Sequence, residues 1–347
     1  MCGPACGRVL YSKAMRIGIV TPAPPYSHYG NRITALRWGG ILTKLGHRTS
    51  IVQKYEGQSY DLLIALHARR SSSSIRRFHR DHPQLPLVLA LTGTDLYRDI
   101  RHHIGAKRAL EVADRVIVLQ PNALRELPSE FRSKTRVIYQ SIESKKAKES
   151  PRTASAELSS QRLSANKDFT VCVIGHLRPV KDPFRAALAV RLLPHDSKIL
   201  LVHVGRAMME NMATKARAEM KINSRYRWLG ERSHSRAQQI LAGCRLCVLS
   251  SRIEGGANVL SEAILAAVPV LASRIEGNVG ILGSNYPGLF NVGDTKGLAR
   301  LLSRAETDRT YLNDLIARVR KLARLFRRAR EEQAWAQLLS ELLKPQP

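Results

Sequence analysis

The sequence predicts an α/β protein made of two Rossmann-like, doubly wound domains, and three observations lead to this prediction. Short apolar runs of strand length alternate with segments of helical periodicity, a pattern typical of a parallel sheet with helices on both faces. The alternation stops at a polar stretch, residues 144–167, and then starts again. The chain has 347 residues, of which 44% are apolar, so it is long enough for two domains with sizeable cores.

The first domain is expected over residues 15–143. Residues 1–14 lack the apolar segment of a signal peptide, so we expect a disordered leader or a start-site artefact there. Residues 144–167 are polar and rich in Ser, Ala and Lys, which is typical of a linker between domains. Helical patterns are expected near 31–45, 71–81, 102–113 and 121–127. The predicted strands are Ile17–Thr21, Thr49–Val52, Leu62–Leu66, Leu87–Leu91, Val116–Leu119 and Val137–Tyr139.

The second domain is expected over residues 168–327. Its predicted strands are Val171–Ile174, Ile199–Val204, Arg227–Leu229, Leu246–Leu249, Val270–Ala272 and Leu289–Val292. The last segment, Tyr311 to Leu343, is predicted to be helical, with an apolar face over residues 312–326 and many arginines on its other faces. We favour a packing helix with a solvated face, although the basic part, residues 312–330, can also contact an anionic membrane surface weakly. No apolar run is long enough to cross a membrane.

The chain is strongly basic, with a net charge of +28. Such a charge attracts nucleic acid, an anionic membrane or small anionic substrates. The basic residues are spread along the chain and no nucleic-acid-binding motif is present, so no specific nucleic-acid partner is expected. Five cysteines without a signal peptide point to a reducing, cytoplasmic compartment. Cys244 and Cys247 have the spacing of a metal or redox site, but they run into an apolar segment, which favours a buried strand.

The most informative stretch runs from Ser251 to Glu262, between a predicted strand and a predicted helix. Its turn aims backbone N–H groups and a helix dipole at an anion, and its glycines allow close approach of a ligand. Glu262 lies about one turn inside the helix, roughly 6 Å along the axis from Asn258. This spacing suits a diphosphate on the N–H groups and a pair of sugar hydroxyls on the carboxylate. The alternative is an ordinary turn with a solvated Glu254. The donor-binding candidates here are Gly255, Gly256, Ala257, Asn258, Val259 and Glu262.

Other candidates follow from the rule that ligands bind at the carboxyl ends of parallel strands. Gly30 opens a helix and can bring N–H groups to a phosphate of the donor, or it can belong to a proline-rich surface loop. His67 can be a ligand or a satisfied core histidine, and Asp95 can be a ligand or a helix cap. Arg178 and Lys181 follow the first strand of the second domain. They can neutralise a leaving diphosphate or simply be charges of a solvated loop.

The Glu254-x7-Glu262 turn within two doubly wound halves resembles the retaining glycosyltransferases of GT-B fold, of the family 4 type, over roughly residues 15–343. The resemblance implies two Rossmann-like domains that face each other across a cleft, an N-terminal acceptor domain and a C-terminal nucleotide-sugar domain. It places Glu262 on the ribose, Glu254 on the donor sugar, and Arg178 and Lys181 on the diphosphate. It also implies that a final helix, about 328–344, joins the first domain.

Two departures from the family pattern bear on function. Gly175-His176-Leu177 replaces the usual Gly-Arg-Leu, so the role of the arginine passes to Arg178 or is shared. Thr92 replaces a histidine that often contacts the donor sugar. This second change disfavours ordinary sugar-acceptor chemistry.

Several whole stretches resemble a narrower group, the selenosugar synthases of selenoneine biosynthesis. They are Thr21–Pro25, Gly30–Arg32, Ala35–Trp38, Ala65–Arg70, Ala90–Tyr97, Gly175–Pro183, Ser251–Asn258 and Gly277–Asn278. This resemblance implies a UDP-sugar donor, selenophosphate as the nucleophile and a 1-seleno-sugar product, with no metal. Selenophosphate brings an anionic selenium, so no dedicated base is needed. The acceptor-binding candidates are Asn31, Arg32, His67, Arg69, Thr94 and Asp95.

Two other functions stay open at this point. One is a family 4 transferase that acts on a sugar or a lipid-linked hydroxyl acceptor. The other is a nucleic-acid-binding protein on a transferase scaffold, since a fold does not fix a function.

Overall fold

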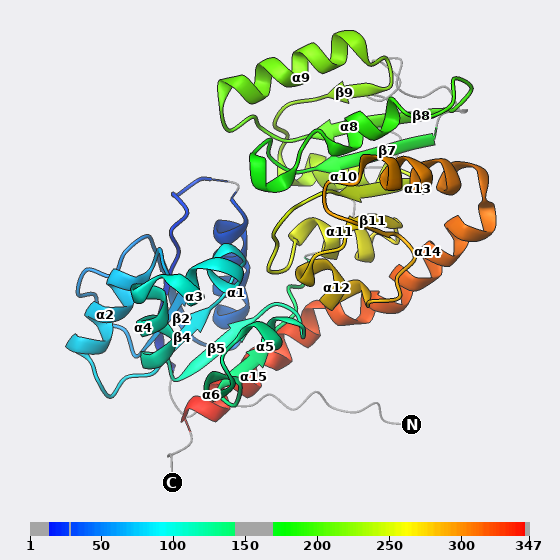
Figure 1. The fold of residues 1–347 in the computed structure, drawn as a ribbon. Helices are drawn as coiled ribbons and strands as arrows, with labels where there is room; N and C mark the ends of the chain where they lie inside the picture. The colour runs from blue at the N-terminus through cyan, green and yellow to red at the C-terminus, as the bar shows by residue number, and fades with distance from the viewer. Residues whose placement is uncertain (1–13, 28, 143–168, 344–347) are drawn as a thin grey trace, which may run out of the picture. The chain divides into compact units, whose positions relative to one another are not determined.

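The computed structural model describes residues 14–27, 29–142 and 169–343, which divide into two compact units (Figure 1). Unit 1 comprises the chain up to Tyr139 together with the residues from Arg328 onward, and unit 2 runs from Gln140 to Arg327. The expected leader, apart from Ala14, and the expected linker at 144–167 lie outside the described residues.

Unit 1 contains a six-stranded parallel sheet in the order β2-β1-β3-β4-β5-β6. Each strand lies within two residues of its predicted bounds, which confirms the alternation seen in the sequence. The strands are β1 (Arg16–Val20), β2 (Arg48–Val52), β3 (Leu62–Leu66), β4 (Leu87–Ala90), β5 (Arg115–Val118) and β6 (Thr135–Val137). The helical segments are α1 (Gly30–Lys44), α2 (Ser72–Asp81), the π-helix η1 (Asp95–Asp99), α3 (Ile100–His102), α4 (Ile104–Val112), α5 (Ala123–Glu126), α6 (Ser129–Arg132) and α15 (Arg328–Leu343).

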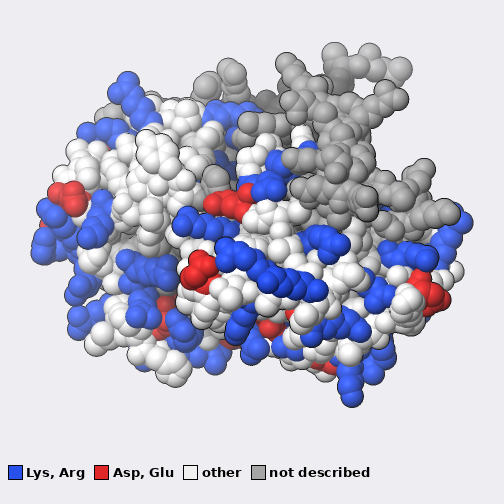
Figure 2. Space-filling view, turned by 90° about the horizontal axis from the view of Figure 1, so that it is seen from above, with Lys and Arg blue, Asp and Glu red and all other residues white. Residues whose placement is uncertain are grey.

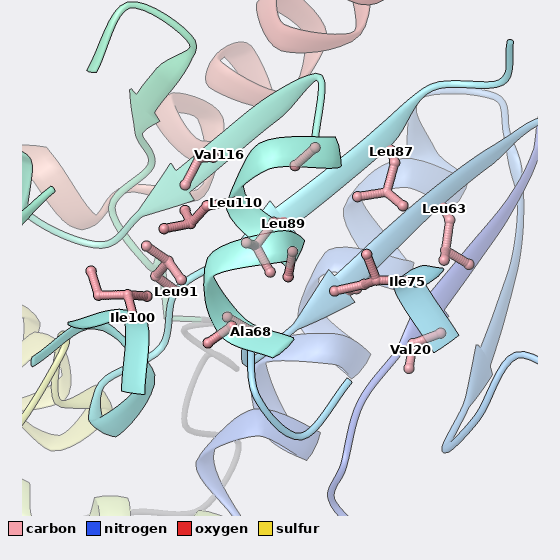
Figure 3. Packing of buried hydrophobic residues seen from close by; sticks show 14 of the residues in the cluster. Val20, Leu63, Ala68, Ile75, Leu87, Leu89, Leu91, Ile100, Leu110 and Val116 are labelled. Carbon is pink, nitrogen blue, oxygen red and sulfur yellow. The ribbon is translucent and has the colours of Figure 1, made fainter. Parts of the chain in front are cut away.

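Alternate residues of these strands point to opposite faces of the sheet, so unit 1 has two apolar layers. On one face, Leu63 and Leu89 pack with Ile75 and Phe78 of α2 and with Leu110 of α4; Figure 3 shows most of these side chains. On the other face, the remaining strand residues pack with α1 and α15. Near-continuous apolar strands are what a sheet covered on both faces requires.

Helix α15 completes the second apolar layer of unit 1. Its Trp335 lies edge-on to Trp38 of α1, with 5.0 Å between the ring centroids. Its buried Glu331 accepts a 2.8 Å hydrogen bond from the indole of Trp38 and pairs with the guanidinium of Arg37, at 3.3 Å. The buried carboxylate is therefore compensated by both an ion pair and a hydrogen bond.

Unit 2 contains a second six-stranded parallel sheet, in the order β12-β11-β10-β7-β8-β9. The strands are β7 (Phe169–Ile174), β8 (Ile199–Val204), β9 (Tyr226–Trp228), β10 (Leu246–Leu249), β11 (Val270–Ser273) and β12 (Leu289–Phe290). The helical segments are the 3-10 turn η2 (Pro179–Lys181), α8 (Arg185–Val190), α9 (Glu210–Ile222), α10 (His234–Gly243), α11 (Asn258–Leu265), α12 (Glu276–Leu282), α13 (Thr295–Thr307), α14 (Arg309–Leu322) and the 3-10 turn η3 (Ala323–Phe326).

The cysteines of unit 2 are part of its core. Cys247 on β10 lies opposite Cys172 on β7, and both side chains are fully buried. Cys244 lies close by, and hydrogen bonding to Cys244 and Cys247 together with burial raises the pKa of the Cys172 thiol. A raised pKa makes a thiol a poor nucleophile and a poor metal ligand. The Cys-x2-Cys spacing is therefore that of a buried strand, as favoured from the sequence.

The last segment, predicted to be helical from Tyr311 to Leu343, is helical on both sides of a turn. The chain forms α14, then η3, then turns at Arg327, whose φ and ψ are −68° and 138°, before α15 begins. The apolar stripe consists of two parts that serve different cores: Leu315 and Val319 are buried in unit 2, and Trp335 packs in unit 1. The exposed face of α14 carries Arg318, Arg320 and Lys321, as expected for a packing helix with a solvated face. No helix in the described ranges is long and apolar enough to cross a membrane.

Candidate functional site

The loops that leave the carboxyl ends of β7 and β10 are neighbours in unit 2, because these two strands pair in parallel. The first loop carries Arg178 and Lys181, and the second carries the turn from Ser251 to Ala257. The carboxyl edge of a parallel sheet is where α/β proteins bind their ligands. The sheet order therefore places these candidates of the second domain at one edge.

Lys181 and Glu254 form an ion pair across these two loops. The Lys181 Nζ donates to Glu254 Oε1, which also accepts a 2.7 Å hydrogen bond from the hydroxyl of Ser251. The two charged side chains are 24% and 13% exposed, so the pair is partly shielded from water and still reachable by a ligand. Glu254 is therefore not freely solvated, which was the alternative left open by the sequence.

The backbone beneath Lys181 is held by Ser250. Its hydroxyl lies within hydrogen-bonding distance of two carbonyl oxygens, that of Lys181 at 3.1 Å and that of Asp182 at 2.9 Å, and donates its hydrogen to them. Asp182 adopts a left-handed conformation, with φ 44°, which turns the chain sharply after Lys181. Arg185 binds the Asp182 carboxylate at 2.9 Å. These contacts fix the place from which the Lys181 side chain extends.

The backbone of Glu254 is held from the other side by α12. A Cβ atom added to Gly277 would lie 2.0 Å from the carbonyl oxygen of Glu254, so only glycine permits this approach. The next residue, Asn278, is fully buried and donates a 2.9 Å hydrogen bond to the carbonyl of Ser273. The Ser273 hydroxyl in turn donates to the carbonyl of Ser251. The turn with Glu254 is thus braced by β11 and α12.

The start of α11 has the features of an anion site. The helix begins at Asn258 after Gly255 and Gly256, no side chain caps its first turn, and no acidic residue lies in that turn. Its N–H groups and dipole favour a negative charge. Arg178 is exposed and forms no ion pair with any described residue, so its charge is available to a ligand.

Glu262 lies in the second turn of α11 and is only 7% exposed. Its Oε1 is 2.7 Å from Nε2 of His234, the first residue of α10. The His234 side chain is 47% exposed. His234 could not be identified from the sequence, because its contact with Glu262 joins residues 28 positions apart. Its place after the short strand β9, at the same sheet edge, was the available signal.

In unit 1, Asp95 organises two neighbouring loops. Its fully buried carboxylate accepts backbone hydrogen bonds from Thr92 at 3.0 Å, Gly93 at 2.8 Å and Ala68 at 3.1 Å. These N–H groups precede the π-helix that Asp95 begins, so the residue is not a cap of the usual kind. With its carboxylate satisfied by the backbone, Asp95 is better suited to positioning these loops than to contacting a substrate.

His67 lies in one of these loops. Its backbone is left-handed, with φ 73°, which is uncommon for a residue with a side chain. The ring is 4% exposed; Nε2 lies 3.2 Å from the Thr94 hydroxyl, and Nδ1 accepts from the N–H of Arg70 at 3.4 Å. These bonds favour a satisfied histidine, while the unusual conformation at a strand end is of the kind found at functional sites.

The remaining candidates of unit 1 belong to two places. Gly30, Asn31 and Arg32 form the first turn of α1, which no side chain caps, and Gly30 opens the helix as expected. The Nε of the half-buried Arg32 is shielded from solvent and has no hydrogen-bond partner in the described structure. Arg69, by contrast, pairs with Asp99 at 3.5 Å. Arg32 is therefore a better candidate than Arg69 for binding an anionic ligand.

The positive charge itself does not mark the site. In Figure 2, Lys and Arg side chains are distributed over the described part of this face, and the acidic side chains are few and scattered. Within the described ranges, no group of three or more His, Cys, Asp or Glu side chains is arranged to hold a metal ion.

Comparisons with known proteins give this site its class. Residues 155–322, just under half of the chain, match the family described as glycosyl transferases group 1. A crystal structure of Anabaena HepE in complex with UDP and glucose matches with a TM-score of 0.75 and 18% identity, covering 94% of this chain and 100% of that chain. Sucrose-phosphate synthase from Thermosynechococcus elongatus gives a TM-score of 0.74 and 16% identity, over 94% and 99% of the two chains. A Rickettsia africae glycosyltransferase gives 0.74 and 14%, over 97% and 100%.

The two doubly wound units have the GT-B fold, and the protein is a glycosyltransferase. More particularly, the part of the chain that matches the group 1 family model contains Lys181, Glu254 and Glu262.

Proposed function

We propose that this glycosyltransferase transfers the sugar of a UDP-sugar to selenophosphate, giving a 1-seleno-sugar for selenoneine biosynthesis. The observation that carries the donor half is the Glu262 carboxylate. It is nine-tenths buried, it has one partner among the described residues, and it lies one turn inside a helix whose N-cap residue, Ala257, makes no side-chain capping hydrogen bond. The HepE structures with UDP and with UDP-glucose support UDP as the nucleotide.

In this proposal the donor is held by unit 2. The first turn of α11, including Gly255 to Val259, receives the diphosphate, and Glu262 receives the ribose hydroxyls. Arg178 and Lys181 stabilise the charge that grows on the departing UDP. Glu254, held by Lys181 and Ser251, faces the donor sugar.

The acceptor is assigned to unit 1. Arg32 supplies the charge for a small dianion, and Asn31 and Thr94 are neutral donors. His67 and Arg69, in the loop after β3, are further acceptor-binding candidates. Asp95 positions the His67 loop through its hydrogen bond from the N–H of Ala68, and its own loop through those from Thr92 and Gly93. Support for selenophosphate comes from the stretches shared with selenosugar synthases and from Thr92 in place of a sugar-contacting histidine. The unpartnered Nε of Arg32 adds to it.

The proposed reaction has two steps, a substitution at the anomeric carbon and a hydrolysis. The selenium of selenophosphate attacks the anomeric carbon, the bond between that carbon and the UDP oxygen breaks, and UDP leaves with the electron pair. The first product is a sugar joined through selenium to phosphorus. Water then cleaves the selenium–phosphorus bond, which releases phosphate and the 1-seleno-sugar. No proton has to be removed from the nucleophile.

The test is incubation of the purified protein with UDP-glucose or UDP-N-acetylglucosamine and freshly made selenophosphate. We expect a selenosugar by selenium-specific mass spectrometry, in step with released UDP. Turnover only with a sugar or a lipid-linked alcohol would contradict the acceptor and favour ordinary family 4 chemistry. UDP release without a carbon–selenium product would also contradict it.

A variant locates the acceptor site. Arg32→Ala should raise the KM for selenophosphate by roughly ten- to a hundredfold, because one cationic contact to a dianion is lost. Arg108→Ala, at an exposed arginine of α4 in the same unit, removes the same charge from a distant surface and serves as the control. If the two variants behaved alike, the anion site would not include Arg32.

A further inference from the structure

We infer that His234 is a positioning residue that sets the Glu262 carboxylate for the ribose of the nucleotide. The inference rests on the proposed donor and adds a residue that the sequence did not single out. His234 is held in place by its own helix. The hydroxyl of Ser233 accepts a hydrogen bond from the N–H of Arg236, at 3.3 Å, and so fixes the first turn of α10.

The contact between His234 and Glu262 is directional. An ionised carboxylate only accepts hydrogen bonds, so the imidazole Nε2–H donates to Oε1 over 2.7 Å. Glu262 is on α11 and His234 is on α10, and these helices pack against each other, so neither partner depends on a loose loop.

This bond leaves Oε2 and a further acceptor position on Oε1 for a ligand. A carboxylate has about four acceptor positions on its two oxygens. No other hydrogen bond or ion pair to the Glu262 side chain is present in the part of the chain that the structure describes. A nine-tenths buried carboxylate with a single partner is costly unless a further donor arrives. Two neighbouring hydroxyls of a ribose are donors of the required kind.

The histidine also limits how the carboxylate can turn. The last torsion of a glutamate is broad, so an unrestrained carboxylate samples many orientations. Binding of Oε1 by His234 restricts this torsion before the ligand arrives, which lowers the cost of ordering on binding. The effect acts on the hydroxyl contact alone. His234 should therefore matter only for nucleotides that possess ribose hydroxyls.

The experiment is calorimetric titration of the full chain with UDP and with 2′,3′-dideoxy-UDP. We expect His234→Ala to weaken UDP binding by about three- to tenfold, the effect of losing one ordinary hydrogen bond. His234→Gln, which keeps a donor, should recover most of the affinity. Dideoxy-UDP should bind the wild type and His234→Ala equally. In a Glu262→Gln background, His234→Ala should cause no further loss of UDP affinity.

Kinetics give a second measurement. The ribose contact is the same in the ground state and the transition state, so His234→Ala should raise the KM for the donor and leave kcat unchanged. Gln238→Ala, in the next turn of α10, is the matched control. A fall in kcat, or an equal loss for UDP and dideoxy-UDP, would overturn the inference. So would unchanged UDP affinity in a folded His234→Ala variant. Absence of UDP binding by the wild type would instead overturn the proposed donor.

Discussion

Replacement of Gly277 by alanine should separate catalysis from stability in unit 2. The added Cβ would lie 2.0 Å from the carbonyl oxygen of Glu254, and real Cβ atoms essentially never come within 3.0 Å of another heavy atom. The atom it meets belongs to the backbone and cannot swing aside. Either α12 or the turn with Glu254 must therefore move by about 1 Å, which is the difference between the two distances.

Such a shift reaches the proposed catalytic side chains directly. Glu254 is bound to Lys181 and Ser251, so movement of its backbone disturbs all three groups. A misplacement of about 1 Å can lower a rate by roughly a hundredfold. Overpacking costs about 1–3 kcal/mol of stability, and alanine returns up to about 1 kcal/mol of helix propensity. We therefore expect a large loss of turnover and a modest loss of stability.

The assay compares Gly277→Ala with Gly243→Ala. Gly243 is the last residue of α10, it has no heavy atom within 4 Å of a built Cβ, and its φ is not in the left-handed region. UDP release from the donor measures turnover, calorimetry with UDP measures donor binding, and thermal unfolding measures stability. Turnover of Gly277→Ala should fall by about a hundredfold, and that of Gly243→Ala should not change. Full turnover in Gly277→Ala would refute the argument that this contact holds Glu254 in place.

Three further outcomes are expected. Glu262→Gln should weaken UDP binding by about 1.5–3 kcal/mol, because a charged acceptor becomes neutral; unchanged affinity in a folded variant would remove Glu262 from the site. Lys181→Ala should lower kcat by about 10²–10³, as for other groups that stabilise a leaving anion, and a change in KM alone would show a uniform binder. His203, held between Tyr226 and Gly175, is neutral because burial lowers the pKa of its imidazole to about 4, from an ordinary value of 6.5. Since the unfolded chain takes up a proton at His203 between these values and the folded unit does not, stability should fall by roughly 3 kcal/mol as the pH drops from 6.5 to 4. Denaturant unfolding of His203→Gln should lack this component, and an identical pH dependence in both proteins would contradict the assignment.

The strands of both units could be predicted because burial on two faces imposes a simple pattern. Residues such as Leu62 to Leu66 are all fully buried, so every position of the strand must be apolar. Helix starts at strand ends were predictable for the same reason: Gly30 and Asn258 each follow a strand and a turn. Local pattern and local structure agree at these places.

The details of the site depend on contacts between distant residues, and no local pattern reports them. The partner of Glu262 is 28 positions away, and the close neighbour of Glu254 is Gly277 on another helix. Asp95 could have been a ligand or a cap, because either role suits a carboxylate in a turn. Only the positions of the N–H groups around it distinguish these roles. Helical periodicity alone does not reveal which core a stripe joins, and the final helix at about 328–344 was expected only from the resemblance to the GT-B family.

The return of the last helix to unit 1 has a consequence for how the protein is made. The ribosome makes strands β1 to β6 before unit 2, but the layer that contains Trp38 lacks Trp335, Leu338 and Leu339 until unit 2 has also been made. Until then an apolar surface is open and the guanidinium of Arg37 has no Glu331. Unit 2, which is continuous in the chain, can fold before unit 1 is finished. During synthesis, unit 2 can therefore be folded while unit 1 still exposes an apolar surface, and such a surface favours aggregation.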